Sequence, residues 1–264
     1  MFASPGEIAF YIGSVSVYYY GIIMAVSLFI GVMTAYFVTK KYYSQLNPEI
    51  IYDIAPHIII GAIIGARIYY CLLNFHYYSS NLIEVLEIRH GGISIHGAII
   101  GGLITGAIYV KRHKLPLLKL CDIFSYGLVL GQAVGRWGNF FNSEAFGRPT
   151  DCFLKLYIPI YKRPLEYMQY NFFHPTFLYE CIFDVCIFLI LFFVIRKLSK
   201  NKDGIIFFSY LFLYSIVRII VEQIRIDSVL NVYGIPIAQL VSGLIIIIST
   251  FAIIKIKHSE ADSV

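Results

Sequence analysis

Long apolar segments recur along this chain, and they limit its fold more than any other feature does. We predict seven membrane spans, at residues 18–39, 51–73, 94–110, 120–137, 175–195, 204–222 and 235–254. A membrane-spanning helix needs about 20 mostly apolar residues in a row, because the hydrocarbon core of a bilayer is about 30 Å thick. A membrane β-barrel would instead show short segments of alternating polarity. The expected fold is therefore an all-α integral membrane protein with seven transmembrane helices.

The composition and organisation of the chain agree with this fold class. Of its 264 residues, 58% are hydrophobic and 14% are charged, whereas soluble domains average about 25% charged residues. No polar linker, repeat or low-complexity segment divides the chain, so we expect one transmembrane domain over residues 1–264 with a long extracytoplasmic loop at about 138–173. The five cysteines form no C-x-x-C pair and the histidines form no i, i+4 pair, so we expect no metal site.

The distribution of basic residues predicts the orientation. Twelve of the 21 Lys and Arg residues lie in one set of connections, six lie in the opposite set, and Arg67, Arg136 and Arg218 lie inside predicted spans. Cytoplasmic loops carry the excess of Lys and Arg, which places the N-terminus outside and the C-terminus in the cytoplasm. The net charge of +5 is explained by this asymmetry, and it gives no reason to expect a nucleic-acid partner.

With this orientation, polar side chains from six predicted spans fall at one depth on the extracytoplasmic side. They are Tyr20, Arg67, His96, Arg136, Asn139, His174, Arg218, Glu222 and Arg225. A charged side chain costs ~2.5–3.5 kcal/mol at the centre of a membrane helix and less near the rim. Several such residues at one level therefore favour a shared polar cavity that opens outward over separate snorkelling anchors.

The spacing of these residues indicates what such a cavity would bind. Arg136 and Asn139 are three residues apart and share one helix face, and Arg218, Glu222 and Arg225 form one stripe at i, i+4, i+7. Glu222 can pair with either arginine of its stripe. A guanidinium group donates two parallel hydrogen bonds to a phosphate and keeps its charge. An anionic lipid headgroup fits this pattern, and so does the ion of an anion channel.

Glycine pairs predict close helix packing. G-x-x-x-G pairs occur at Gly61/Gly65, Gly97/Gly101, Gly102/Gly106, Gly127/Gly131 and Gly131/Gly135. Small residues at this spacing let helix backbones approach one another in a membrane. We therefore expect the second, third and fourth spans to pack closely.

Six motifs in order resemble one known family. They are YYG at Tyr19–Gly21, GARIYY at Gly65–Tyr70, HGGISIHGAIIGG at His90–Gly102, GRWGNFFNSEAFG at Gly135–Gly147, HPTFLYE at His174–Glu180 and RIIVEQIR at Arg218–Arg225. The chain resembles the bacterial prolipoprotein diacylglyceryl transferases over nearly its whole length, and the fourth motif is the most specific. The departures are small: His90 stands where the family commonly has an acid, and Ala98 replaces a glycine.

The resemblance implies a fold, a reaction and its partners. Such enzymes have seven transmembrane helices with the N-terminus outside, and they lie in the bacterial inner membrane with the active site toward the extracytoplasmic side. They move the diacylglyceryl group of phosphatidylglycerol onto the lipobox cysteine thiol of a prolipoprotein, which forms a thioether and releases glycerol phosphate. This is the first step of lipoprotein maturation, and it needs no cofactor.

The resemblance also implies the site residues. The expected catalytic residues are Tyr20, His96, Arg136, Arg218 and Glu222. The residues expected to bind phosphatidylglycerol are Arg136, Asn139, Glu144, Gly147 and Arg218. Arg136 and Arg218 would stabilise the charge that develops on the leaving phosphate. The long loop at about 138–173 could clamp the lipobox peptide.

Some roles stay open at this point. The attacking thiol must lose its proton, and His96 is either the base or a hydrogen-bonding residue that positions the substrate, with Glu144 and Glu222 as rival bases. Tyr20 either bonds a headgroup hydroxyl or is an ordinary interfacial tyrosine. An anion transporter would need a second gate on the cytoplasmic side, and it would often show inverted repeats, which this sequence lacks. A seven-helix receptor rests on helix count alone.

Overall fold

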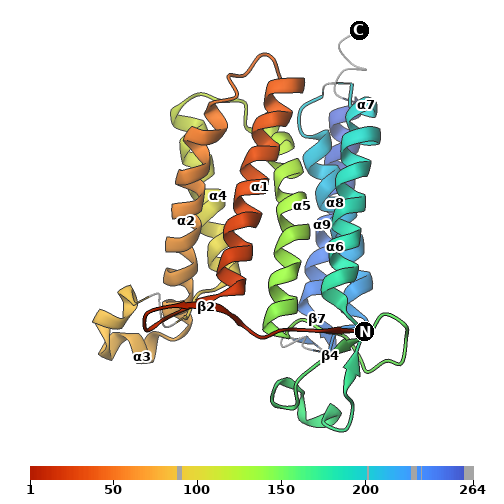
Figure 1. Ribbon diagram of the computed structural model, residues 1–264. Coiled ribbons are helices and arrows are strands. Elements are labelled where there is room, and N and C mark those ends of the chain that lie inside the picture. The colour runs from red at the N-terminus through yellow and green to blue at the C-terminus, as the bar shows by residue number, and fades with distance from the viewer. Residues whose placement is uncertain (88–90, 201, 227–230, 233, 259–264) are drawn as a thin grey trace. The chain divides into compact units, whose positions relative to one another are not determined.

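The computed structural model describes residues 1–87, 91–200, 202–226, 231–232 and 234–258, and His90 lies outside them (Figure 1). The chain packs as two compact units. The first unit comprises Met1–Ala35 with Cys121–Val264, and the second comprises Tyr36–Leu120.

The described part of the chain is mostly helical. Its helices are α1 Tyr19–Tyr42, α2 Ile50–Leu73, α3 Phe75–Ser80, α4 Ile95–Arg112, α5 Leu117–Asn142, α6 Thr176–Leu189, α7 Arg196–Leu198, α8 Ile205–Glu222 and α9 Ile237–His258 (Figure 1). A π-helical stretch, Ile190–Ile195, joins α6 to α7.

Six helices within the described residues are long and apolar enough to cross a membrane: α1, α2, α5, α6 with its continuation to Leu198, α8 and α9. The helical membrane architecture predicted from the sequence agrees with this. The shorter α4 is not among the six, because its 18 residues include four glycines and the charged pair Lys111 and Arg112.

Short strands occupy the connections, where the all-α prediction had none. They are β1 Phe2–Ala3, β2 Ile8–Ile12, β3 Val15–Tyr18, β4 Leu156–Tyr157, β5 Phe172–Phe173, β6 Asn231–Val232 and β7 Ile235–Pro236. Strands β2 and β3 form one antiparallel hairpin, and β6 and β7 form another. Most of these strands have two residues, which is too short for an alternating pattern to show in the sequence.

In the first unit, α1 and α5 pack antiparallel through small residues. A Cβ added at Gly127 would lie 2.2 Å from the carbonyl oxygen of Gly31. Further along, Ser27 Oγ donates a hydrogen bond to the Gly131 carbonyl at 2.6 Å. The glycines of the fourth predicted span therefore pack against the first span, a partner that the prediction of close packing among the second, third and fourth spans did not include.

Helix α8 is attached to α5 at two levels, and this attachment positions the site. The buried Asp122 carboxylate of α5 accepts hydrogen bonds from the backbone N–H groups of Gly204, at 2.6 Å, and Phe207, at 2.7 Å. It thereby caps the N-terminus of α8, whose first N–H groups have no partners inside the helix. Farther along, the Tyr210 hydroxyl donates to Gln132 Oε1 at 2.9 Å.

In the second unit, α2 and α4 pack antiparallel with almost no space between their backbones. A Cβ added at Gly101 would lie 2.2 Å from the Gly61 carbonyl oxygen, and one added at Gly97 would lie 2.3 Å from the Gly65 carbonyl oxygen. The G-x-x-x-G pairs of the second and third spans thus face one another, as predicted.

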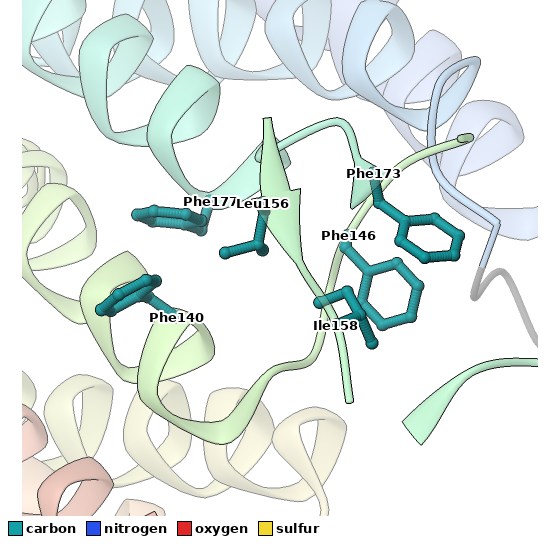
Figure 2. Close-up of a cluster of buried hydrophobic side chains, with 6 residues drawn as sticks. All are labelled: Phe140, Phe146, Leu156, Ile158, Phe173 and Phe177. Atoms are coloured by element: carbon teal, nitrogen blue, oxygen red, sulfur yellow. The ribbon is translucent and has the colours of Figure 1, made fainter. Parts of the chain in front are cut away.

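The long connection between α5 and α6 is an ordered structure built around an apolar cluster. Figure 2 shows its buried members, which are Phe140, Phe146, Leu156, Ile158, Phe173 and Phe177. A three-stranded sheet in the order β1-β4-β5 adds the chain's second and third residues to this connection. Because Phe140 lies in the last turns of α5 and Phe177 in the first turn of α6, the cluster holds these two helix ends together.

Candidate functional site

A buried carboxylate on α6 gathers three arginines in the first unit. Glu180 is 3% exposed and forms an ion pair with Arg136 of α5. Its Oε1 atom lies 3.4 Å from Arg225 Nη1 and 4.0 Å from Arg218 Nη1. Side chains from α5, α8 and the segment after α8 therefore converge on one group, and their arginines are only 14–22% exposed. We call Arg136, Arg218 and Arg225 the arginine cluster.

Other groups of α8 complete this arrangement. Arg218 Nη2 lies 2.7 Å from Glu222 Oε2, the i, i+4 pair expected from the sequence, and Glu222 is buried. Arg136 Nη2 donates to the Tyr214 hydroxyl at 3.3 Å. Within the described residues, the buried Arg136 Nε has no hydrogen-bond partner.

Asp184 lies one helical turn from Glu180 and is 1% exposed. Its charge acts on Arg136, and its Oδ2 atom has no hydrogen-bond partner among the described residues. The two acids share one face of α6 because i and i+4 side chains lie one above the other.

A second polar group follows at the end of α5. Asn139 Nδ2 and Asn142 Nδ2 both donate to Glu144 Oε1, at 3.0 and 3.3 Å. The helix ends in a turn in which the Ser143 N–H donates to Phe140 and the Glu144 N–H donates to Asn139. This is the Schellman pattern, and Ser143 adopts the left-handed conformation (φ 51°) that glycine usually supplies there. We call Asn139, Asn142 and Glu144 the amide–carboxylate cluster.

Tyr20 packs against the part of α5 that carries Arg136 and Asn139. It lies in the first turn of α1 with its ring against Gly138, where an added Cβ would lie 2.9 Å from Tyr20 Cδ2. Its phenol interacts electrostatically with both Glu144 and Arg136. Gly138 is therefore required for the close approach of a tyrosine ring to the helix that carries Arg136 and Asn139.

Gly147 has a packing role in this structure. A Cβ at this position would lie 2.7 Å from Ile224 Cγ2 and 2.9 Å from His174 Cβ. Its N–H donates to the His174 carbonyl, and it forms an isolated bridge with Arg225. The absence of a side chain at Gly147 thus lets the segment that carries Arg225 lie next to the connection before α6.

His174 belongs to the same packing arrangement. Its Nδ1 atom lies 3.0 Å from the Tyr179 hydroxyl, within hydrogen-bond distance. Burial lowers the pKa of His174 from its ordinary value. Two residues later, at the first residue of α6, Thr176 Oγ1 donates to the Ala145 carbonyl. These contacts are those of a residue at the start of a helix.

His96 lies in the second unit, whereas both clusters lie in the first. It is exposed in the first turn of α4, after the N-cap residue Ser94, and its ring centroid is 6.1 Å from that of Tyr69. Its role in the reaction stays a prediction.

Arg67, also in the second unit, has a different environment from the one expected. Its guanidinium donates to backbone carbonyls of the segment after α3, namely those of Glu84, Val85, Glu87, Gly91 and Gly92. It also lies over the Tyr78 ring, at 5.1 Å from the centroid, beside a cavity of about 80 Å³. The sequence placed Arg67 among the residues of one shared polar cavity, but its donors hold this loop.

Sequence reasoning omitted several members of the site. Glu180, Asp184, Tyr214 and Asn142 were not assigned to it, although acids four residues apart inside an apolar span are a signal of function. No group of three or more His, Cys, Asp or Glu side chains suited to a metal ion occurs in the described part of the chain.

The chain matches one known family over most of its length. The family model for prolipoprotein diacylglyceryl transferase matches residues 7–255. The chain is similar to phosphatidylglycerol–prolipoprotein diacylglyceryl transferases of Nostoc sp. (43% identity, covering 92% of this chain and 86% of the relative) and Thermosynechococcus vestitus (39% identity, 97% and 94%). It is also similar to the one of Synechocystis sp. (40% identity, 96% and 90%).

Proposed function

The chain belongs to the prolipoprotein diacylglyceryl transferase family, and we propose from this premise that it carries out the first step of lipoprotein maturation. The substrates are phosphatidylglycerol and the lipobox cysteine of a prolipoprotein. The thiolate sulfur attacks the carbon of the diacylglyceryl unit that is bonded to the phosphate oxygen. A carbon–sulfur bond forms, and the bond between that carbon and the phosphate oxygen breaks. Glycerol phosphate leaves with the electron pair, and the thiol proton passes to a base. The reaction as written needs no cofactor.

The arginine cluster carries this proposal. The leaving phosphate gains negative charge in the transition state, and guanidinium donors already in place stabilise it without reorganisation. Arg136 and Arg218 come from different helices and meet at Glu180. Glu180 thus holds the donors together before a phosphate shares them. Removal of one such donor typically costs about 2.7–4 kcal/mol of transition-state stabilisation.

His96 remains the proposed proton acceptor. Glu222 lies 2.7 Å from Arg218, and Glu144 accepts two amide hydrogen bonds. Both carboxylates are therefore already engaged by other groups of the site. Histidine changes charge near neutral pH, which suits a general base. Substantial turnover in a His96→Gln variant would reassign this residue to positioning.

The deciding experiment mixes purified protein, phosphatidylglycerol and a lipobox peptide and measures the peptide mass. We expect a gain of one diacylglyceryl group. The Arg136→Lys variant keeps the charge but loses the two-pronged donor, so its kcat/KM should fall about 100-fold or more. Arg112→Lys, at an exposed arginine on the last turn of α4, is the matched control. If the peptide gained no mass while a relative used as positive control was active, the activity would be excluded. An active Arg136→Lys variant would exclude a role for the two parallel hydrogen bonds of the guanidinium.

We also propose that α4 is the seventh span. Because α1 and α5 run antiparallel, α1 ends at the same end of this helix pair at which α5 begins. The intervening chain must therefore cross an even number of times. Since α2 is one crossing, α4 is the other.

The proposed orientation places the N-terminus outside and the C-terminus in the cytoplasm of a bacterial inner membrane. Basic residues in the last turns of α1, α4 and α9 support it. Both clusters of the first unit lie at the end where α5 terminates, which is then the extracytoplasmic side. A reporter enzyme active only outside the cell, fused to the C-terminus, should be inactive, and its activity would reverse the orientation.

The remaining assignments concern organisation and partners. We propose that residues 1–264 form one transmembrane domain, and that the connection between α5 and α6 contacts the lipobox peptide. Its most exposed apolar side chains, Phe153, Tyr161 and Leu165, support a peptide contact there. The partners are then the lipid, the peptide and the membrane, with no nucleic acid.

A further inference from the structure

Arg67, a buried residue of α2, spends its hydrogen-bond donors on one loop of the second unit. A guanidinium group has five N–H donors and no acceptor. Five backbone carbonyls accept from this one, namely those of Val85 at Nε, Gly91 and Gly92 at Nη1, and Glu84 and Glu87 at Nη2. One buried cation therefore ties the segment that follows α3 to the segment that precedes α4.

The same turn of α2 also holds the first turn of α4. The Ala66 carbonyl accepts a hydrogen bond at 3.1 Å from the N–H of Ser94, the N-cap residue of α4. A Cβ added at Gly97 would lie 2.4 Å from Tyr69 Cβ. His96 lies between these two contacts, with its ring centroid 6.1 Å from that of Tyr69. The backbone on both sides of His96 is therefore placed by one turn of α2.

Gly92 connects the guanidinium of Arg67 to this first turn of α4. It lies two residues before Ser94 and adopts a φ of 76°, in the left-handed region that favours glycine. A Cβ at this position would lie 2.5 Å from Arg67 Nη1 and 2.8 Å from Tyr70 Cε1. A displacement of the guanidinium would therefore move Gly92 and, with it, the start of α4.

The loop that Arg67 holds buries little of its own surface. Leu82, Ile83 and Leu86 are 72–83% exposed, and no residue of the turn that they form is buried. A buried charge in an apolar helix is costly, and the fixation of such a loop adds little apolar burial in return. What the fixed loop does provide is a defined path of the chain into α4 and His96.

We propose that Arg67 is a positioning residue of the transfer reaction, which acts through His96 by fixing the path of the loop into α4. This role is the same whether His96 accepts the thiol proton or orients a substrate, because both tasks require the ring at one place. The inference rests on the proposed function for the reaction that His96 serves.

Two variants disturb the contact from its two sides. Arg67→Lys keeps the charge, but a single ammonium nitrogen cannot replace the planar five-donor group. Gly92→Ala keeps the arginine and places a Cβ 2.5 Å from its Nη1 atom. Gly91→Ala is the matched control for backbone strain, because Gly91 has a φ of 86° but its added Cβ would meet nothing within 4 Å. Arg112→Lys, at an exposed arginine on the last turn of α4, is the control for the arginine change.

The position of His96 can be followed without the transfer reaction. Diethyl pyrocarbonate modifies neutral histidine rings, and mass spectrometry of the detergent-solubilised full chain gives the rate at each histidine. His113, directly after the last residue of α4, is the internal reference, with its ring stacked on Tyr109 at 4.2 Å. Arg67→Lys and Gly92→Ala should change the ratio of the His96 rate to the His113 rate several-fold.

Transfer to a lipobox peptide then gives kcat and KM separately. A misplacement of about 1 Å can cost about 100-fold in rate. We therefore expect Arg67→Lys and Gly92→Ala to lower kcat about 10-fold to 100-fold with KM unchanged. Gly91→Ala should lower kcat much less than Gly92→Ala does, and Arg112→Lys should not lower it. In a chain that already carries His96→Gln, Arg67→Lys should lower kcat no further, because the two changes act on one element.

Four outcomes would overturn the inference. They are an unchanged His96 rate, equal changes at His96 and His113, equal effects of Gly91→Ala and Gly92→Ala, and an active chain whose kcat does not respond to Arg67→Lys. The histidine rates do not depend on transfer. A chain in which the His96 rate responds as expected but no peptide is modified would therefore refute only the proposed function.

Discussion

The Glu180→Gln substitution tests the central charge arrangement of the first unit. Gln has nearly the same shape as Glu, so the change removes a charge without creating a cavity. Glu180 is 3% exposed, and its Oε1 atom lies 3.4 Å from Arg225 and 4.0 Å from Arg218, with Arg136 closer still. At an effective dielectric constant of about 20, each of the two measured pairs is worth about 4–5 kcal/mol before desolvation.

The net loss of stability is smaller than the sum of these pair energies. Removal of the carboxylate also relieves its own desolvation, and broken buried ion pairs typically cost about 3–5 kcal/mol. For a chain of this size, 1 kcal/mol shifts the melting temperature by about 2–4 °C. We therefore expect Glu180→Gln to melt about 6–20 °C below the wild type.

Phosphate provides the second part of the assay. With Glu180 neutral, the arginine cluster carries one more unit of uncompensated positive charge, so inorganic phosphate should bind more tightly. A ligand at 100 times its Kd stabilises a protein by about 2.7 kcal/mol. Thermal unfolding in detergent, with and without phosphate, should show a larger phosphate shift in the variant than in the wild type.

Glu166→Gln is the matched control, because Glu166 is an exposed acid in the connection between α5 and α6. It should leave both the melting temperature and the phosphate shift unchanged. If Glu180→Gln behaved like this control, Glu180 would not be the group that holds the arginines together.

Two further predictions concern helix packing and pH. Gly101→Ala would place a Cβ 2.2 Å from the Gly61 carbonyl oxygen, so α2 and α4 must separate; thermal unfolding should show a loss of about 1–3 kcal/mol, whereas Gly243→Ala, whose Cβ meets nothing within 4 Å, should lose none. Equal melting temperatures for the two variants would contradict this packing. Burial lowers the pKa of His174, so the unfolded chain takes up the proton first and stability falls as pH drops below about 6.5. His174→Gln should reduce the loss of stability between pH 7.5 and 5.5, and the exposed His76→Gln should not; identical pH profiles for wild type and His174→Gln would refute the assignment.

Some features of this protein follow from the sequence because their causes are local. Apolar runs of about 20 residues identify membrane helices wherever they occur. The ion pair between Arg218 and Glu222 follows from i, i+4 spacing on one helix. Six ordered motifs were enough to indicate the family, and the family model agrees. None of these inferences needs to know which helix lies beside which.

The tertiary structure decided every feature that joins distant segments. The sequence placed Arg67 and Arg136 at one depth. In the structure, however, Arg67 donates to backbone carbonyls of the segment after α3, whereas Arg136 pairs with Glu180. Likewise, the glycines of α5 were recognised as packing residues, but their partner turned out to be α1.

The physical reason is that helical periodicity determines which face a side chain occupies but not which neighbour that face meets. The choice of neighbour depends on the summed packing of small residues, caps and turns across the whole fold. Asp122 illustrates this, because a carboxylate on α5 caps a helix that begins more than 80 residues later. The face that a side chain occupies on its helix was therefore readable from the sequence, whereas the meeting of three arginines at Glu180 required the folded chain.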